Sequence, residues 1–397
     1  MRVISRRAPV VTAAAALLAL AACSSGGSSP SRPAGSGATS AGARSGSVGG
    51  GTGSPAPGSG SSVSGRPRVF AYYYLWWSRA HWQDSLGSQY PYAASPLPLP
   101  ARLDQDGCNP AQLYPGVTVT DVPNRLYGQD DPGVIEQDVR AAAGAGLAGF
   151  AVNWIGTGAQ AQTLDDNQYT PRLQAMVDAV HAVNRSGTPF SLWLSYKASA
   201  KVLPVDQIIN DLTWFQHTYG SDPAFDRTQS PRITVIWNGS RKYPVSALQA
   251  VSSALRGKLR IIGDETQWSA DRAPYLDGDA YYWSSQNPYR NPRSFQQLAD
   301  LARSVRASTG NPDGSAKTFV APLIPGYNKQ LIGGSGCVPR RNGQTLRTVF
   351  DGNLAATHPD AWALISWNEI TEGTYVTPMQ RFGTQDLDML RSIVSGR

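Results

Sequence analysis

Eight short apolar runs, separated by helical patterns, are the feature that most restricts what this chain can fold into. Each run is continuously apolar or aromatic rather than alternating, which is typical of strands buried on both faces of a parallel sheet. The eight predicted strands are Val69–Leu75, Gly149–Trp154, Phe190–Tyr196, Ile233–Trp237, Leu259–Gly263, Ala280–Trp283, Thr318–Leu323 and Ala363–Trp367.

Helical patterns fill the intervals between these runs. The clearest one follows Asp131, a residue suited to cap a helix N-terminus, and ends before Gly146. The link between the fifth and sixth runs has only about fifteen residues, so its helix is expected to be weak or irregular. The predicted helices are Pro132–Ala145, Pro171–Asn184, Val205–His217, Ser246–Arg256, Pro292–Ser308, Thr345–Thr357 and Thr384–Ser395.

Eight strand–helix repeats predict an α/β protein with a single (β/α)8 TIM barrel over residues 67–397. The competing architecture, a doubly wound sheet, would be expected to show a glycine-rich phosphate turn after its first strand. That position here contains no glycine and reads Tyr74, Leu75, Trp76 and Trp77. The sequence therefore favours the barrel.

The N-terminal residues resemble a bacterial lipoprotein signal. Three arginines precede an apolar stretch, residues 8–22, that is too short to span a bilayer and leads through small residues to Cys23. We interpret residues 1–22 as a signal peptide and Cys23 as the lipidation site, which would anchor the protein to the membrane outside the cytoplasm. A plain secretory signal is the alternative. Residues 23–66, rich in Gly, Ser, Pro and Ala, would then be a disordered tether.

The formal net charge of +7 does not describe the predicted barrel. Six of the 35 basic residues precede residue 67, where no acidic residue occurs, so 29 basic residues face 28 acidic ones in the remainder. This balance does not support a nucleic-acid partner. A monomer is expected.

The three cysteines predict one disulfide and no metal site. With Cys23 assigned to lipid, Cys108 and Cys337 remain as an even pair in an oxidising compartment. They lie in the loops after the first and seventh strands, and a closed barrel brings these loops to the same face. No His, Cys or carboxylate residues have the spacing of metal ligands, so neither a metal nor another cofactor is expected.

Polar and aromatic side chains gather where the predicted strands end. In a barrel enzyme, chemistry takes place at these ends. Aromatic faces together with amide and carboxylate groups suit a carbohydrate, whose rings are apolar on their faces and hydroxylated at their edges. The candidate substrate-binding residues are Tyr74, Trp76, Trp77, His81, Asn153, Trp154, Tyr196, Asn238, Glu265, Trp283, Tyr327 and Asn368.

Two acids, Glu369 and Glu372, follow the eighth predicted strand three residues apart. Glycoside cleavage needs one carboxylic acid to protonate the departing oxygen and a second carboxylate beside the reacting carbon. Repulsion between two neighbouring acids would help to keep one of them protonated. The structural alternative is that both acids interact with the dipole of the last helix.

The stretch from Ile365 to Thr374, ISWNEITEGT, is similar to the SWNEWHEGT motif of glycoside hydrolase family 99, the endo-α-mannosidases. Three further stretches resemble the same family: FAYYYLWW at residues 70–77 with His81 and Trp82, DVRAAAGAGLAGFAVNW at 138–154, and RFG with Leu387 at the closing helix. The resemblance spans the predicted barrel, but only the Asn-Glu-x-x-Glu-Gly-Thr core is specific.

This resemblance implies a retaining glycosidase acting on an α-linked, mannose-containing glycan or polysaccharide. By position in the motif, Glu369 would be the base toward the 2-hydroxyl of the sugar, giving an anhydro-sugar intermediate, and Glu372 the acid/base. The chain departs from the motif at Ile370 and Thr371, where the family has Trp and His, and also at Leu75 and Thr377. These departures favour glycoside hydrolysis over a specific assignment to mannose.

Two other hypotheses stay open. Glu369 could pair with Glu265 across the barrel mouth, giving a retaining glycosidase with an enzyme nucleophile. Alternatively, the protein could be a carbohydrate-binding surface lipoprotein on a barrel without catalytic activity.

Overall fold

The computed structural model describes residues 66–90, 108, 117–157, 168–197 and 202–397. Residues 66–397 form one compact unit. The predicted signal segment 1–22, the lipidation site Cys23 and, apart from Arg66, the predicted tether lie outside the described residues. Within the described ranges, no helix combines the length and apolar character needed to cross a membrane.

Eight parallel strands close into a barrel in the order β1, β10, β7, β6, β5, β4, β3 and β2, and β2 pairs again with β1. The predicted (β/α)8 barrel is therefore confirmed. The barrel strands are β1 (Val69–Tyr74), β2 (Gly149–Trp154), β3 (Ser191–Lys197), β4 (Ile233–Asn238), β5 (Leu259–Gly263), β6 (Gly278–Asp279), β7 (Thr318–Leu323) and β10 (Ala361–Leu364).

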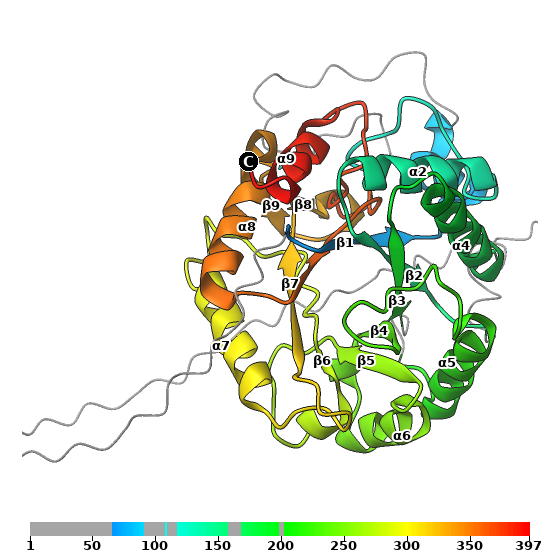
Figure 1. Cartoon of the computed structure of the whole chain (residues 1–397). Coiled ribbons are helices and arrows are strands. Elements are labelled where there is room, and N and C mark those ends of the chain that lie inside the picture. The colour runs from blue at the N-terminus through cyan, green and yellow to red at the C-terminus, as the bar shows by residue number, and fades with distance from the viewer. Residues whose placement is uncertain (1–65, 91–107, 109–116, 158–167, 198–201) are drawn as a thin grey trace, which may run out of the picture. The chain divides into compact units, whose positions relative to one another are not determined.

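Helices surround this ring of strands (Figure 1). The Asp131 carboxylate caps the first predicted helix by accepting the N–H of Gly133 at 2.9 Å. The fifth and sixth strands are joined only by a short 3-10 turn, Ala273–Tyr275, as the sequence predicted. The surrounding helices are α2 (Pro132–Gly144), α4 (Tyr169–Arg185), α5 (Val205–Tyr219), α6 (Val245–Leu255), α7 (Ser294–Ala307), α8 (Gln344–Thr357) and α9 (Gln385–Val394).

The position predicted for the sixth strand is wrong. The strand is Gly278–Asp279, and the aromatic run Ala280–Trp283 follows it as a loop. The backbones approach closely here, because a Cβ on Gly278 would lie 2.2 Å from the carbonyl oxygen of Thr318. A strand that must fit against its neighbour in this way requires glycine rather than a bulky apolar residue.

The eighth barrel strand, β10, ends earlier than predicted. It stops at Leu364, so Trp367 and the acids after it lie in a turn rather than at the last strand positions. The chain remains attached to the barrel beyond the strand, since the Trp367 N–H donates to the Tyr72 carbonyl at 2.8 Å. The turn is therefore held over the carboxyl end of β1.

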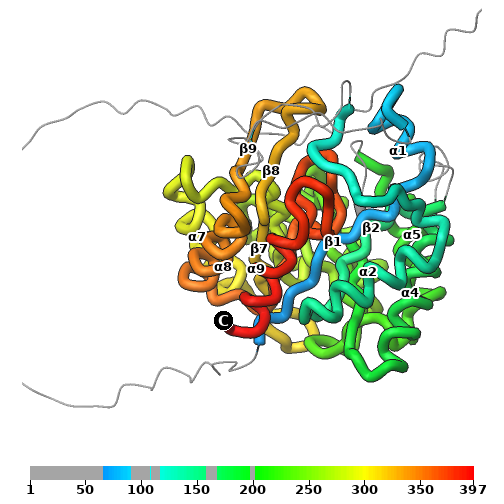
Figure 2. The backbone as a smooth tube through the Cα atoms, turned by 90° about the horizontal axis from the view of Figure 1, so that it is seen from above, coloured from blue at the N-terminus to red at the C-terminus, as the bar shows by residue number. Residues whose placement is uncertain are grey.

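Two elements at the same end of the barrel were not predicted (Figure 2). One is helix α1 (Arg79–Leu86), which directly follows β1. The other is an antiparallel hairpin of β8 (Tyr327–Asn328) and β9 (Cys337–Val338), which follows β7. Both lie at the carboxyl ends of the barrel strands, where the candidate residues gather.

The disulfide predicted between Cys108 and Cys337 is present. The two Cα atoms are 5.6 Å apart and 229 residues apart in the chain. Cys337 belongs to β9, so the bond ties the segment between β1 and β2 to the hairpin after β7. The covalent link therefore fastens the rim of the barrel rather than its core.

We predict that replacing both Cys108 and Cys337 by Ser lowers the free energy of unfolding by about 2–5 kcal/mol, because the bond restricts the conformations that the unfolded chain can adopt. Urea unfolding of the double variant and of the unreduced parent measures the difference. Alkylation of the denatured, unreduced parent followed by intact-mass measurement is the control. Two alkylated thiols in the parent at these positions would contradict the bond.

Candidate active site

Successive side chains point to opposite faces of a strand. A hydrogen bond from one strand side chain to a helix therefore shows that the side chains before and after it point into the barrel. The Tyr73 hydroxyl donates to Asp138 of α2 at 2.8 Å, so Tyr73 faces the helices. Tyr72 and Tyr74 must then face the barrel interior. Burial raises the pKa of the Asp138 carboxyl to about 6.

Two predicted site residues face the helices instead of the barrel interior. The Trp154 indole donates to the Thr170 hydroxyl of α4 at 3.2 Å, and the Tyr196 hydroxyl donates to Asp211 of α5 at 2.8 Å. The structure therefore places both rings between strands and helices, away from the other candidates. By the same alternation, Asn153 points inward.

The end of β1 is joined to the turn after β10 through Asn368. The Asn368 amide oxygen accepts the Tyr74 N–H at 2.8 Å, and its amide nitrogen donates to the Tyr74 carbonyl at 2.9 Å. The Trp77 indole donates to the Asn368 carbonyl at 2.8 Å. All three residues are buried. Asn368, predicted to bind substrate, thus uses both ends of its amide to hold the backbone.

Glu369 lies in the turn from Ser366 to Thr374. Its N–H donates to the Ser366 hydroxyl at 2.7 Å, and its carbonyl accepts the Thr374 N–H at 3.1 Å. Its carboxylate oxygen Oε1 accepts the Thr371 N–H at 3.1 Å, the Thr371 hydroxyl and the Glu372 N–H at 3.3 Å. Only 4% of Glu369 is exposed. Donors of this kind stabilise a carboxylate in its charged, proton-accepting form.

Glu372 is half-buried and sits nearer the surface than Glu369. Its backbone carbonyl accepts the Asn328 N–H of β8 at 2.7 Å, which fixes the turn to the hairpin. The next residue, Gly373, has φ +63°, a conformation that favours glycine. Helix α9 begins only at Gln385, so the two acids do not sit at its N-terminus, and the structural alternative of a helix dipole contact is wrong.

The charges of the two acids reach three tyrosines. Burial raises the pKa values of Tyr74, Tyr282 and Tyr327, and the charges of Glu369 and Glu372 raise them further. The hydroxyls of Tyr74 and Tyr282 lie 2.7 Å apart and share a hydrogen bond. These phenols stay neutral near pH 7, so each keeps its proton beside the acids.

The barrel interior holds buried polar atoms that have no hydrogen-bond partner among the described residues. They are the Tyr72 hydroxyl, both amide atoms of Asn153, Oδ1 of Asn238 and Oδ2 of Asp279. The other amide atom of Asn238 donates to the Ser195 hydroxyl at 2.6 Å. Buried polar groups are nearly always bonded, so these atoms indicate water or a polar ligand inside the barrel.

Asp279 adds a hydrogen-bond donor to this set. Burial raises the pKa of its carboxyl well above the usual range, and its Oδ1 accepts the Glu265 N–H at 2.8 Å. The neutral form would carry its proton on Oδ2, the oxygen that has no partner among the described residues. Burial raises the pKa of Tyr72 well above its usual range, and its ring meets the Tyr282 ring edge-on with centroids 5.0 Å apart.

Glu265 is fully engaged by neighbouring side chains. Its Oε2 accepts Arg272 Nε at 2.8 Å, and its Oε1 accepts Arg272 Nη2 at 2.9 Å and the Ser240 hydroxyl at 2.6 Å. A carboxylate held by a guanidinium on both oxygens is poorly placed to attack a sugar carbon. The geometry therefore does not support the hypothesis that Glu265 pairs with Glu369 as a nucleophile.

The remaining aromatic candidates form a stack beside the mouth. Trp76 stacks on Tyr74 with ring centroids 4.4 Å apart and lies parallel to His81 at 5.9 Å. Burial and the charge of Arg172 lower the pKa of His81 to about 4, so its imidazole is neutral near pH 7. Trp283 is half-buried and stacks on Tyr281 in the loop after β6, with centroids 5.4 Å apart.

Sequence reasoning missed Tyr72, Tyr282 and Asp279. Tyr72 was hidden because an unbroken apolar strand does not reveal which face each residue takes. Tyr282 and Asp279 could have been found from the run DAYYW at 279–283 only if the sixth strand had been placed before it. Among the described residues, no group of three or more His, Cys, Asp or Glu side chains could hold a metal ion.

No family model matches this chain, and neither does any curated protein. Solved structures with the same architecture include the family 99 endo-α-mannosidase of Bacteroides thetaiotaomicron in complex with BIS-TRIS-propane. That structure has a TM-score of 0.58 and 15% sequence identity, over 83% of this chain and 95% of the other. A glycoside hydrolase-like protein matches with a TM-score of 0.55 and 14% identity, over 86% and 97% of the two chains. At these identities the similarity establishes a shared fold, and it agrees with the resemblance to family 99 seen in the sequence.

Proposed function

We propose that the protein is an extracytoplasmic, retaining glycoside hydrolase that acts on an α-linked, mannose-containing glycan. The observation that carries this proposal is the turn at the carboxyl end of the barrel, where the Glu372 N–H donates to the Glu369 carboxylate and the charges of both acids raise the pKa values of three nearby tyrosines. Two acids at one place, one deeply buried and one nearer the surface, suit the two proton transfers of glycoside cleavage.

The environments of the two acids favour different roles. Glu369 accepts three hydrogen bonds from uncharged donors and is buried, which suits a base that takes a proton from the bound sugar. Glu372 is half-buried and sits where the leaving part of a glycan would extend toward solvent, which suits a proton donor. This assignment follows the order of the two glutamates in the family 99 motif.

In the proposed reaction, Glu369 takes the proton of the sugar 2-hydroxyl. The freed oxygen attacks the anomeric carbon, and the glycosidic bond breaks as Glu372 gives its proton to the departing oxygen. A water molecule then loses a proton to Glu372 and attacks the same carbon. The anhydro ring opens as its oxygen recovers a proton from Glu369, which leaves both acids in their starting states.

The interior polar atoms support a sugar as the ligand. Tyr72 and Asp279 can donate hydrogen bonds, Asn238 can accept one, and Asn153 can do both. A sugar ring carries hydroxyl groups that donate and accept, so it can satisfy such a mixed set. An apolar ligand would leave these buried groups unpaired, at a cost of about 1–3 kcal/mol each.

The location is part of the same proposal. The disulfide between Cys108 and Cys337 suits an oxidising compartment outside the cytoplasm. Lipid on Cys23 would hold the barrel to the membrane through the tether and keep it near envelope glycans.

A second candidate function, carbohydrate binding without catalysis, is favoured by one observation. Thr371 replaces the histidine of the family motif, and both its N–H and its hydroxyl bond to the oxygen Oε1 of Glu369. A base held in this way could have lost its catalytic role. Release of new reducing ends from α-mannan or related bacterial polysaccharides separates the enzyme from the binding protein.

We predict that Glu372→Gln lowers turnover of a natural glycan by about 10²–10⁴-fold. The loss should be much smaller on an aryl glycoside whose leaving group is already acidic, because that group needs little protonation. Glu369→Gln should lose activity on both substrates, since an activated leaving group cannot replace the base. Initial rates on both substrates measure the difference.

Glu136→Gln is the matched control for these two variants. Glu136 lies on the exposed face of α2, where it pairs only with Arg140, and should retain normal activity. Thermal unfolding should be similar for all three variants, because glutamine keeps an oxygen that can accept the hydrogen bonds of the turn. Near-normal turnover of both Glu369→Gln and Glu372→Gln would refute the assignment.

We also predict that activity does not depend on a metal ion, because an acid/base pair of carboxylates requires none. Dialysis against EDTA should leave the rate of glycan cleavage unchanged within experimental error. The control is the same assay after divalent ions are added back. An activity that disappears with the chelator and returns with one divalent ion would contradict this prediction.

A further inference from the structure

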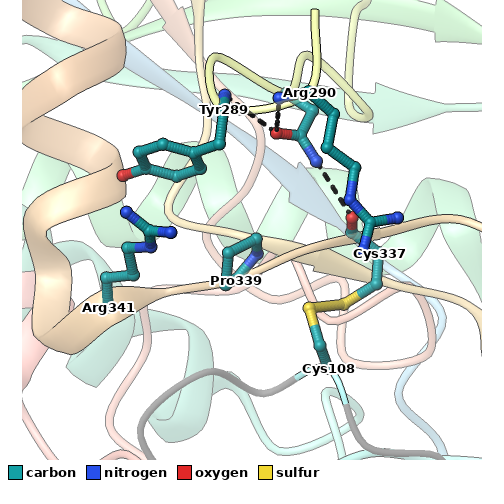
Figure 3. A pocket seen from close by; sticks show the side chains of 7 residues that line it. Cys108, Tyr289, Arg290, Cys337, Pro339 and Arg341 are labelled. Carbon is teal, nitrogen blue, oxygen red and sulfur yellow. Dashed lines mark hydrogen bonds between the residues drawn. A yellow bond between two sulfur atoms is a disulfide. The ribbon is translucent and has the colours of Figure 1, made fainter.

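A small pocket lies beside the disulfide (Figure 3). Its volume is about 210 Å³. One wall is formed by Cys337 and its bonded partner Cys108, and another by Tyr289. Arg290 and Arg341 border it, with Pro339 between them. The described residues of the lining are therefore basic, although the predicted barrel as a whole has almost no net charge.

Neither arginine is neutralised by the described part of the protein. Within those ranges, no carboxylate forms an ion pair with Arg290 or Arg341, and both residues are exposed. By contrast, the neighbouring Arg340 is buried and pairs with Asp386. Two unpaired guanidinium groups on one small pocket form a favourable place for an anionic oxygen group.

The backbone holds Arg341 in an unusual conformation. Arg341 and Asn342 have φ values of 50° and 53°, in the left-handed region that side chains other than glycine rarely adopt. The Arg341 guanidinium lies 3.7 Å from the centre of the Tyr289 ring, and the Tyr289 hydroxyl is 3.0 Å from the Thr345 hydroxyl. Backbone strain of this kind is concentrated at ligand sites.

Arg290 is fixed to the other side of the pocket by Asn287. The Asn287 amide oxygen accepts the N–H groups of Tyr289 and Arg290, each at 3.0 Å. Its amide nitrogen donates to the Cys337 carbonyl at 3.2 Å. These bonds, drawn in Figure 3, join the loop after β6 to the hairpin, so both arginines are carried by one braced framework.

The same hairpin connects the pocket to the candidate catalytic turn. Cys337 pairs with Asn328 across the hairpin, and the Asn328 N–H donates to the Glu372 carbonyl at 2.7 Å. The paired strands of the hairpin lie about 4.8 Å apart, and one hydrogen bond spans the remaining step to the turn. A glycan cleaved at Glu372 could therefore extend along the hairpin to the arginines.

We propose that the pocket bordered by Arg290 and Arg341 binds a carboxylate or phosphate group carried by the glycan substrate, at a subsite beyond the cleaved bond. The inference rests on the proposed glycosidase function for the identity of its ligand. It narrows the substrate class to acidic glycans, and it assigns to the two arginines a role in binding rather than in bond cleavage.

Calorimetric titration tests this proposal with two matched probes, an α-linked mannotetraose that carries one glucuronate and its methyl-esterified, uncharged form. The protein should bind the acidic probe more tightly, and the difference should shrink when NaCl is raised from about 50 to about 300 mM, because salt screens exposed charges. The double variant Arg290→Gln and Arg341→Gln should bind the acidic probe roughly tenfold or more weakly than the parent does. Its affinity for the esterified probe should be unchanged. Arg303→Gln, an exposed arginine of α7, is the control and should change neither affinity.

Three outcomes would overturn the proposal: equal affinity of the parent for the two probes, equal affinity of parent and double variant for the acidic probe, or no binding of it at all. Inorganic phosphate is titrated alone, and an affinity equal to that for the acidic probe would indicate a free-anion site instead. Cleavage of an uncharged glycan is measured on the same samples. If none of the forms cleaves any glycan, the glycosidase proposal fails, while the titrations still decide the role of the arginines.

Discussion

The amide of Asn368 is the contact on which the mouth of this barrel depends. It bonds both the N–H and the carbonyl of Tyr74, and so joins the end of the first strand to the turn after the last one. Gln129 donates to the same carbonyl at 2.8 Å, which closes the arrangement from the segment between β1 and β2. All of these groups are buried, so loss of the amide would leave the Tyr74 N–H unpaired, at a cost of about 1–3 kcal/mol, while the Tyr74 carbonyl would keep its bond from Gln129. Because Glu369 is the next residue, the same contact also sets its position relative to the Tyr74 ring.

The sequence was sufficient to predict the architecture because most strands of this parallel barrel are unbroken apolar runs. That same property hides the face each side chain takes. Trp154 and Tyr196 end their strands much as Asn153 and Tyr74 do, yet they reach α4 and α5. No alternation of polar and apolar residues distinguishes the two faces when both are buried. The inward or outward orientation of these residues therefore becomes visible only from the hydrogen bonds of their neighbours.

The prediction of the sixth strand failed for a different physical reason. Its Gly278 is required by a close backbone approach to Thr318, and at Asp279 burial raises the pKa of the carboxyl, which favours the uncharged form. Neither residue has the propensity of a strand, whereas the aromatic residues that follow do. The disulfide was predictable because it needed only a count of cysteines and the rule that loops after the strands of a closed barrel share one face.

The departures from the family 99 motif bear on orientation more than on charge. Thr371 stands where the family has histidine, and its two donors reach Oε1 of Glu369 together with the Glu372 N–H. None of these donors carries a charge, so they orient the carboxylate without neutralising it, unlike the guanidinium that holds Glu265. Ile370, which replaces the motif tryptophan, is fully buried and packs in the core. The changed residues thus hold the turn and the Glu369 carboxylate in place. Neither of them replaces Tyr74, Tyr282 or Tyr327, whose pKa values the two acids raise.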